Sequence, residues 1–231
     1  MAKLLFSHPR VFRPLVATSM RSADVANKAV IAGRLELNGY ADGSVFENLK
    51  FQITDDSKKK NIFTGTNYKY PAIATLYATG VTFDGCEFES DIATGVCGIN
   101  YGSHASGKLL KVNNCKFEGD FYAIRTRTCF EITNNEFNVY TDQGTLAAVW
   151  TWGNGEAKTQ KNAGATSVVF TGNKNVNASK VYGVQLTSTT FNYCHINFDV
   201  QNNTNFYELK DALSSACDYT GKVFAEGSET F

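Results

Sequence analysis

Proline is scarce in this chain, with three residues in 231, and the sequence also lacks a long apolar run. Three prolines are too few for a proline-rich linker, and a chain of this length can bury one sizeable core, so we expect one domain. Without a run of about 18 apolar residues there is no candidate transmembrane helix. The apolar patch at residues 4–6 is too short for the hydrophobic region of a signal peptide, so we expect synthesis in a cytoplasm without export.

Zinc-ligand spacings and CxxC pairs are missing from the six cysteines. In a reducing cytoplasm such cysteines remain thiols and act as small core residues. The three histidines lack the Ser, Asp or Cys arrangement that marks a catalytic triad. We therefore expect neither a metal nor a cofactor.

The charges balance overall, with 22 basic and 22 acidic side chains, which argues against a general nucleic-acid binder. Their distribution is uneven, because residues 1–34 hold six Lys or Arg against Asp24 alone, about +5. The remaining residues then carry about −5, since the total is zero. A basic N-terminal segment precedes an acidic body.

One short phrase recurs along the body: an apolar residue, a polar one, Asn or Gly, a small or polar residue, a polar residue and an aromatic one. It occurs at residues 46–51, 83–88, 112–117 and 132–137. Two looser copies lie at 170–176 and 200–206, where the final apolar residue of the phrase comes one position later, at Val176 and Phe206. The spacing between copies varies while the phrase stays constant. A repeat of this kind is typical of stacked structural units joined by loops of unequal length.

The third position of the phrase is always Asn or Gly: Asn48, Gly85, Asn114, Asn134, Gly172 and Asn202. These residues most readily adopt left-handed backbone angles, so a sharp bend is predicted at each of them. Before the bend, apolar and polar side chains alternate with the period of a strand that has one buried face.

A second phrase, a small residue followed by a β-branched one, lies between copies of the first, at residues 72–73, 98–99, 123–124, 148–149 and 183–184. Each copy lies in a strand-like run, and no helical period is evident in the body. Two strand phrases per period with a bend at Asn or Gly predict a parallel β-solenoid. The alternative is a β-sandwich with short strands and Asn-rich turns.

The repeated phrases resemble the single-stranded right-handed parallel β-helix of the pectin-lyase type, over roughly two thirds of the chain. The resemblance implies an all-β fold, a right-handed parallel β-helix. With the residues at the two ends, we expect 1–34 to form a basic N-terminal extended arm and cap, 35–207 the β-helix and 208–231 a short C-terminal cap of helix and tail. It also implies that Asn114, Asn134 and Asn202 share an Asn ladder, and that Cys86 and Cys115 are neighbours along the stack. Lyases, hydrolases and phage spikes share this fold, so it does not define a function.

The arm is predicted to be a docking segment, because it mixes basic and apolar residues and carries no repeat. The residues assigned to docking are Lys3, Leu5, Phe6, Arg10, Phe12 and Arg13. The alternative is that this segment forms a first strand and a cap folded on its own chain. At the other end, residues 206–213 have the spacing of a short closing helix.

Polygalacturonase-like hydrolases carry Asn-Thr-Asp, Asp-Asp and Gly-His-Gly motifs, and the first and last of these do not occur here. The only Asp-Asp pair, Asp55-Asp56, lies beside Lys58, Lys59 and Lys60 in what we expect to be a solvated loop. A lyase would need carboxylates for Ca²⁺ and a basic side chain near the substrate. The weak candidates are Arg125, Arg127, Asp120 and Glu118, for which a surface ion-pair cluster is the favoured interpretation.

A surface binding patch is predicted from the second phrase, whose β-branched column should point inward. The residues on the outward column would be Asn100, Arg125, Trp150, Trp152 and Gln185. Exposed Trp beside Arg, Asn and Gln suits sugar stacking or protein docking. The alternative is that both tryptophans pack beneath the segment 153–166.

Taken together, these features favour a non-enzymatic structural protein of a virus particle: a bacteriophage head-decoration or tail-attached β-helix anchored by its arm. Its partners would be other capsid or tail proteins and itself as a homotrimer, located in the virion, with no nucleic acid and no membrane involved. The alternatives are a polysaccharide-degrading lyase or hydrolase and a glycan-binding adhesin that recognises a host glycan.

Overall fold

The computed structural model describes residues 3–4, 11–12, 14, 16–32, 34–37, 39–53, 72–90, 96–101, 109–119, 121–126, 130–139, 147–151, 166–178, 181–185, 195–207 and 218–222. Apart from one 3₁₀ turn, η1 (Gly39–Ala41), the named elements within them are β-strands.

The strands form three parallel sheets. Sheet A contains β1 (Lys3–Leu4), β4 (Val30–Ala32), β7 (Lys50–Ile53), β10 (Glu87–Ser90), β13 (Lys116–Gly119), β16 (Glu136–Val139) and β19 (Lys174–Asn175). Sheet B contains β2 (Val11–Phe12), β5 (Arg34–Leu37), β8 (Ala72–Leu76), β11 (Val96–Tyr101), β14 (Phe121–Thr126), β17 (Ala147–Thr151), β20 (Val181–Gln185) and β22 (Phe206–Tyr207). Sheet C contains β3 (Ser19–Arg21), β6 (Val45–Glu47), β9 (Thr82–Asp84), β12 (Leu110–Asn113), β15 (Phe130–Thr133), β18 (Thr166–Thr171), β21 (His195–Gln201) and β23 (Asp218–Lys222).

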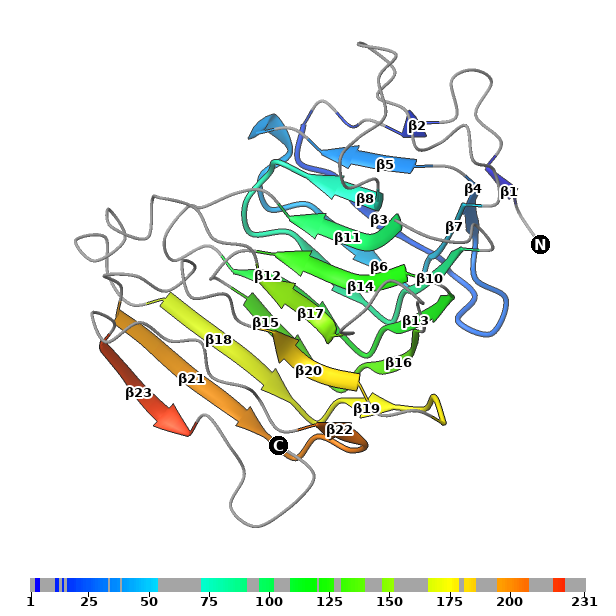
Figure 1. The fold of residues 1–231 in the computed structure, drawn as a ribbon. Helices are drawn as coiled ribbons and strands as arrows, with labels where there is room; N and C mark the ends of the chain where they lie inside the picture. Colours follow the sequence, from blue (N-terminus) through cyan, green and yellow to red (C-terminus); the bar gives the residue numbers. More distant parts are fainter. Residues whose placement is uncertain are drawn as a thin grey trace.

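From β1 to β21 the chain enters sheets A, B and C in strict rotation, so hydrogen-bonded neighbours are three strands apart in sequence. Figure 1 shows the result, with strands side by side in sequence order from blue near the N-terminus to orange and red near the C-terminus. The chain is therefore all-β, as the sequence predicted, with parallel strands throughout the three sheets.

The bend predicted at the third position of the repeat is confirmed in all six copies. The φ angles are 55° at Asn48, 61° at Gly85, 54° at Asn114, 56° at Asn134, 66° at Gly172 and 59° at Asn202. Each bend joins a strand of sheet C to the next strand or bridge of the stack within two or three residues. The left-handed angle turns the chain sharply enough for this short connection, which explains why only Asn and Gly occupy the position.

At two of the bends, glycine is required for a second, steric reason. A Cβ built on Gly85 would lie 2.5 Å from Oδ1 of Asn48, and one built on Gly172 would lie 2.3 Å from Oδ1 of Asn134. The amide of the preceding copy thus occupies the space that a side chain would need.

A stack of phenylalanine rings fills the core beneath sheet A. The rings of Phe51, Phe88, Phe117 and Phe137 follow one another at centroid distances of 5.1, 4.8 and 5.1 Å, with interplanar angles of 5–12°. All four side chains are buried. These are the last positions of the first four copies of the repeat, so the aromatic position of the repeat forms a continuous stack.

The polar ladder lies one residue later than expected. Asn114, Asn134 and Asn202 are exposed, whereas the residues that follow the last two, Asn135 and Asn203, are buried. The expected Asn ladder at the bend position is therefore wrong. A left-handed residue points its side chain away from the core, and the next residue turns inward.

The ladder that does exist runs through Asn135, Asn173 and Asn203, all at most 2% exposed. Nδ2 of Asn135 donates to Oδ1 of Asn173 at 3.0 Å, and Nδ2 of Asn173 donates to Oδ1 of Asn203 at 3.1 Å. Each Nδ2 also donates to a backbone carbonyl of sheet C, at 2.7–2.9 Å. Because its amides are satisfied, the buried polar column stabilises the corner instead of weakening it.

The looser copies of the repeat differ from their expected alignment at one point. The final apolar residue of the phrase was expected to re-enter the core at Val176 and Phe206. Phe206 is indeed buried, but Val176 is 38% exposed. Asn175 takes the place after Phe137 in the register and is buried. Its Nδ2 donates to the carbonyl of Asn205 at 3.1 Å. Hydrogen bonding to the next corner therefore replaces the aromatic contact.

The second phrase is confirmed in four of its five copies. Ile99, Ile124, Val149 and Val184 are in register and fully buried, so this column does point inward. The copy at residues 72–73 is shifted by one, because Ile99 pairs with Ala74.

Both ends contribute strands to the sheets. Within residues 1–34, β1, β2 and β3 pair with β4, β5 and β6, as the alternative interpretation of the arm would have it. The docking role itself stays a prediction. Of the helix predicted at 206–213, residues 206–207 form β22, and the rest lies outside the described residues.

Candidate functional site

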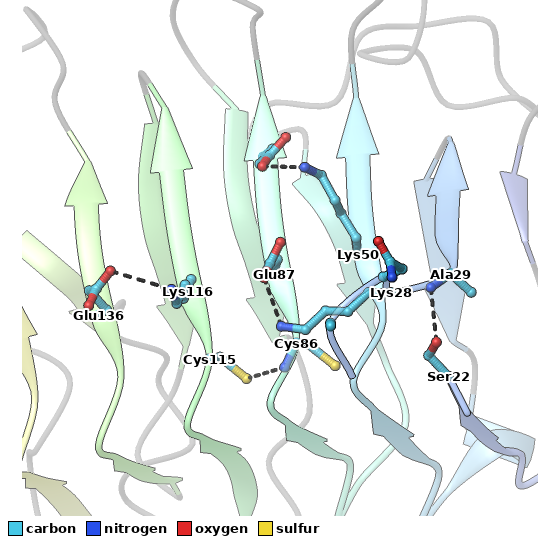
Figure 2. A network of polar contacts seen from close by, with 12 residues as sticks. Ser22, Lys28, Ala29, Lys50, Cys86, Glu87, Cys115, Lys116 and Glu136 are labelled. Atoms are coloured by element: carbon cyan, nitrogen blue, oxygen red, sulfur yellow. Dashed lines mark hydrogen bonds and ion pairs between the residues drawn. The ribbon is translucent and has the colours of Figure 1, made fainter. Parts of the chain in front are cut away.

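The exposed face of sheet A carries a ladder of alternating charge. Lys50, Glu87, Lys116, Glu136 and Lys174 occupy equivalent positions on five successive strands. Lys116 and Glu136 approach to 3.9 Å, and Glu87 accepts from Lys28 at 2.8 Å (Figure 2). Opposite charges on neighbouring strands attract one another, and each exposed pair contributes on the order of 0.5 kcal/mol.

A shallow groove of about 230 Å³ runs along this ladder, over β10, β13 and β16. Its polar lining consists of Glu87, Glu89, Lys116, Glu118, Glu136 and Asn138. Glu89 is bonded by Lys50 and Gln52, and both carboxylate oxygens of Glu118 accept from Nδ2 of Asn138 at 2.8 Å. These carboxylates are engaged by their neighbours, and within the described part of the chain no three His, Cys, Asp or Glu side chains are grouped to hold a metal.

The predicted patch residues come together on sheet B. Asn100, Arg125, Trp150 and Gln185 are successive partners in the register of β11, β14, β17 and β20. Asn100 and Arg125 alternate with the buried aliphatic column, so these two side chains face away from it. Nη1 of Arg125 donates to Oδ1 of Asn100 at 3.2 Å. Trp152 lies outside the described residues.

Arg125 is only 6% exposed, although it lies on the outer face of the sheet. The same column extends toward the N-terminus through Thr75 to Glu36, which is 7% exposed. Glu36 was missed by sequence reasoning, because the shifted copy at residues 72–73 concealed its register. The column thus places two buried charged side chains of opposite sign, Glu36 and Arg125, on the same outer face of sheet B.

The connections of variable length adjoin sheet B on both sides. The connection from sheet C to sheet A takes only two residues in the first five copies, while the segments entering sheet B include residues 54–71 and 140–146. Those leaving sheet B include residues 102–109 and 152–165. The connections that vary in length thus precede and follow the strands of sheet B. Connections between strands commonly carry binding residues, which makes sheet B the candidate binding face.

The weak catalytic candidates do not form one cluster in the described residues. Arg125 lies on β14 of sheet B, and Glu118 lies on the exposed face of β13 in sheet A. Asp120 and Arg127 fall outside the described residues. The hypothesis that these four residues act together therefore gains no support from the placement of the first two.

The docking residues predicted for the arm are only partly described. Lys3 belongs to β1 and Phe12 to β2, and both strands pair within the sheets. The remaining four, Leu5, Phe6, Arg10 and Arg13, lie outside the described residues.

Cys86 and Cys115 are neighbours at the buried corner, as the resemblance implied. Both are free thiols, at most 1% exposed, and the backbone N–H of Cys86 donates to Sγ of Cys115 at 3.3 Å. Burial, together with the contact to Cys86, raises the pKa of the Cys115 thiol well above its usual value. A thiol held in its neutral form is a poor nucleophile, so this pair is a structural feature.

In the described residues, fold and surface together define an all-β protein of three parallel sheets, with a charge ladder on the outer face of sheet A and a polar column on that of sheet B. A comparison of the chain with family models, curated proteins and solved structures finds no match. Across the described ranges, no helix combines the length and apolar character needed to cross a membrane.

Proposed function

We propose that the three sheets are the faces of a right-handed parallel β-helix of the pectin-lyase type. The strict rotation of strands among the sheets supports this, because a chain that coils around one axis returns to the same face every third strand. The in-register stacks of Phe and Asn support it as well, since equivalent residues of successive coils lie one above another.

On this scaffold we infer that the protein serves as a non-enzymatic structural component of a virus particle, a bacteriophage head-decoration or tail-attached protein. The observation that carries the proposal is the continuity between the basic N-terminal segment and the stack. Strands β1 to β4 tie this segment into all three sheets, so a partner that binds the segment also holds the rigid body. An anchoring segment needs this mechanical link.

Co-sedimentation of the full chain with empty virus particles tests the proposal, with light scattering to report a homotrimer. A triple variant, Lys3→Glu, Arg10→Glu and Arg13→Glu, should abolish sedimentation if the basic segment binds the particle. The matched control, Lys58→Glu, Lys59→Glu and Lys60→Glu, makes the same charge change elsewhere and should leave sedimentation intact. If the full chain does not co-sediment with the particles, the proposal is wrong.

The outer column of sheet B favours a second candidate, binding or degradation of a glycan. Arg125 and Asn100 supply hydrogen-bond donors and acceptors, and Trp150 follows in the same register. Together with Gln185 they fit a sugar that carries both an apolar face and polar groups. This candidate separates into an adhesin, which binds without turnover, and an enzyme.

Incubation with host polysaccharides distinguishes these two. Release of reducing ends or unsaturated sugars that disappears in Arg125→Ala would establish an enzyme, whereas binding without product would establish an adhesin. Gln185→Ala is the milder companion variant, to be used if Arg125→Ala fails to fold. Absence of both binding and product would leave only the structural role.

A further inference from the structure

Cys86 and Cys115 occupy the same position on two neighbouring corners of the stack. Each directly follows a left-handed bend residue and directly precedes a strand of sheet A, and these two strands, β10 and β13, pair in register. Backbone hydrogen bonds join the corners on both sides of the cysteines. The N–H of Gly85 donates to the carbonyl of Asn113 at 2.9 Å. The N–H of Lys116 donates to the carbonyl of Cys86, also at 2.9 Å.

This register sets the separation of the two cysteine backbones. Neighbouring parallel strands lie about 4.8 Å apart, and residues in register have their Cα atoms at close to this distance. A disulfide bridges Cα atoms that are about 4.4–6.8 Å apart. The spacing of the two corners therefore suits a disulfide without a movement of the backbone.

Both side chains belong to one buried column at the corner (Figure 2). Sγ of Cys115 lies 3.3 Å from the backbone nitrogen of Cys86, and Sγ of Cys86 lies 3.4 Å from the carbonyl oxygen of Phe46. Each sulfur is thus directed toward the corner before its own, and the sulfur of Cys115 lies against the backbone of Cys86. Rotation about the Cα–Cβ bond of Cys86, from one staggered position to another, turns its sulfur toward that of Cys115.

We propose that Cys86 and Cys115 form a reversible disulfide that locks the two corners together when the protein meets a peroxide. One thiolate attacks the O–O bond of hydrogen peroxide, which forms an S–O bond and releases the other oxygen as water after protonation. The second thiol attacks this sulfenic acid, so that the S–S bond forms, the S–O bond breaks and a second water leaves. In total the two thiols lose two electrons and two protons, and one peroxide is reduced to two waters.

Burial makes this reaction slow and keeps it selective for a small oxidant. Both thiols are at most 1% exposed, so an uncharged molecule of the size of water reaches them more readily than a bulky reagent does. The neighbouring thiol then captures the sulfenic acid before further oxidation. The pair is expected to stay reduced in a reducing cytoplasm and to oxidise outside it. The lock does not depend on the proposed role in a virus particle, since it requires only the two corners and the oxidant.

The disulfide would connect residues that are 29 positions apart in the chain. Closing a loop of this length restricts the unfolded chain far more than the folded one, in which the two corners are already neighbours. The oxidised protein should therefore melt about 5 °C higher than the reduced protein. A reductant added to the oxidised protein should reverse this shift.

The test starts from the full chain with its thiols reduced, which is then exposed to hydrogen peroxide in buffer. Remaining thiols are alkylated in urea to prevent exchange, and the protein is digested with trypsin and a protease that cleaves after Glu. Cleavage after Glu87 or Glu89 separates Cys86 from Cys97, so the linked peptides identify the pair. We expect a peptide that joins Cys86 to Cys115, and an intact mass about 2 Da below that of the reduced chain.

Three variants connect the disulfide to the change in melting temperature. Cys86→Ser and Cys115→Ser should each lose both the link and the shift. Cys97→Ser is the matched control, because Cys97 lies on β11 of sheet B, and it should keep both. The peptide map of the unchanged chain tests the link even if a variant fails to fold.

Two results would overturn the proposal. In the first, peroxide leaves Cys86 and Cys115 as thiols or converts them to sulfinic acids without a link between them. In the second, the link forms but the melting temperature stays the same or falls, which would show that the disulfide strains the corner instead of locking it.

Discussion

The backbone N–H of Cys86 donates a hydrogen bond to Sγ of Cys115 across two neighbouring corners of the stack. One corner further on, the N–H of Cys115 donates to Oδ1 of Asn135 at 2.8 Å. Thiol and amide thus perform the same task in one continuous column, accepting a hydrogen bond from the corner before. The reactivity of the thiols and the stability of the fold both depend on this column and on the bends beside it.

The two buried thiols should resist alkylation in the folded protein. Burial keeps Cys115 neutral by raising its pKa, and only the thiolate reacts quickly with iodoacetamide. Mass spectrometry after labelling at pH 8 should find Cys86 and Cys115 unmodified in buffer and modified in concentrated urea. Rapid labelling of either thiol in buffer would contradict the burial of the pair.

The same thiol should make stability depend on pH on the alkaline side. The pKa of Cys115 is raised on folding, so the folded state binds more protons than the unfolded state once the pH exceeds the ordinary thiol value. Its contribution is therefore complete below about pH 8.5 and is lost as the pH rises toward the folded pKa, by up to about 1.4 kcal/mol per pH unit.

Urea unfolding at pH 8 and pH 10 measures this loss, and Cys115→Ser is the matched variant because a hydroxyl does not titrate in that range. The decrease in unfolding free energy should be smaller in Cys115→Ser than in the unchanged chain. Equal decreases would show that other groups, not this thiol, set the alkaline limit.

Asn173 should be the most sensitive member of the amide ladder. Its Nδ2 donates to the carbonyl of Ile132 and to Asn203, and its Oδ1 accepts from both nitrogens of Asn135. Asn173→Ala removes these bonds and leaves the buried backbone N–H of Asn135 without its acceptor, whereas Oδ1 of Asn203 keeps the backbone N–H of residue 173. We expect a loss of about 3 kcal/mol in unfolding free energy. Asn138→Ala, which removes a contact to Glu118 at an exposed position, should cost less than about 1 kcal/mol.

Gly85→Ala should destabilise the protein for two separable reasons. The φ of 61° disfavours a side chain, and the new Cβ would lie 2.5 Å from Oδ1 of Asn48. We expect a cost of about 2 kcal/mol or more in a urea titration. Gly39→Ala is the control, because no atom lies within 4 Å of its Cβ position.

The double variant Asn48→Gly with Gly85→Ala separates these reasons. Removal of the Asn48 side chain should recover the part of the loss that comes from the contact and leave the part that comes from the backbone angle. If the two substitutions are additive, the contact with Asn48 contributes nothing to the requirement for glycine.

Sequence alone was sufficient for the alternating strand pattern and for the six bends at the third position of the repeat. The period of two, the phenylalanines at a fixed offset and the recurring Asn or Gly are local features, and local backbone preferences predict their structure directly. The aliphatic column of Ile99, Ile124, Val149 and Val184 followed from the same pattern.

Sequence could not predict the amide ladder or the position of Glu36. Asn134 and Asn135 are chemically identical, and only the left-handed angle at the first decides that the second turns inward. The inclusion of Glu36 in the column of Arg125 depends on which strands are neighbours, a relationship between segments far apart in the chain.

The sequence by itself thus determined the repeating unit, because alternation, bends and core aromatics are encoded within each segment. Only the tertiary structure decided the register between units, and with it which side chains share a corner or a face. The physical reason is that register is set by the packing of all the buried columns at once: a shift of one residue would exchange the two faces of a strand and expose its phenylalanine.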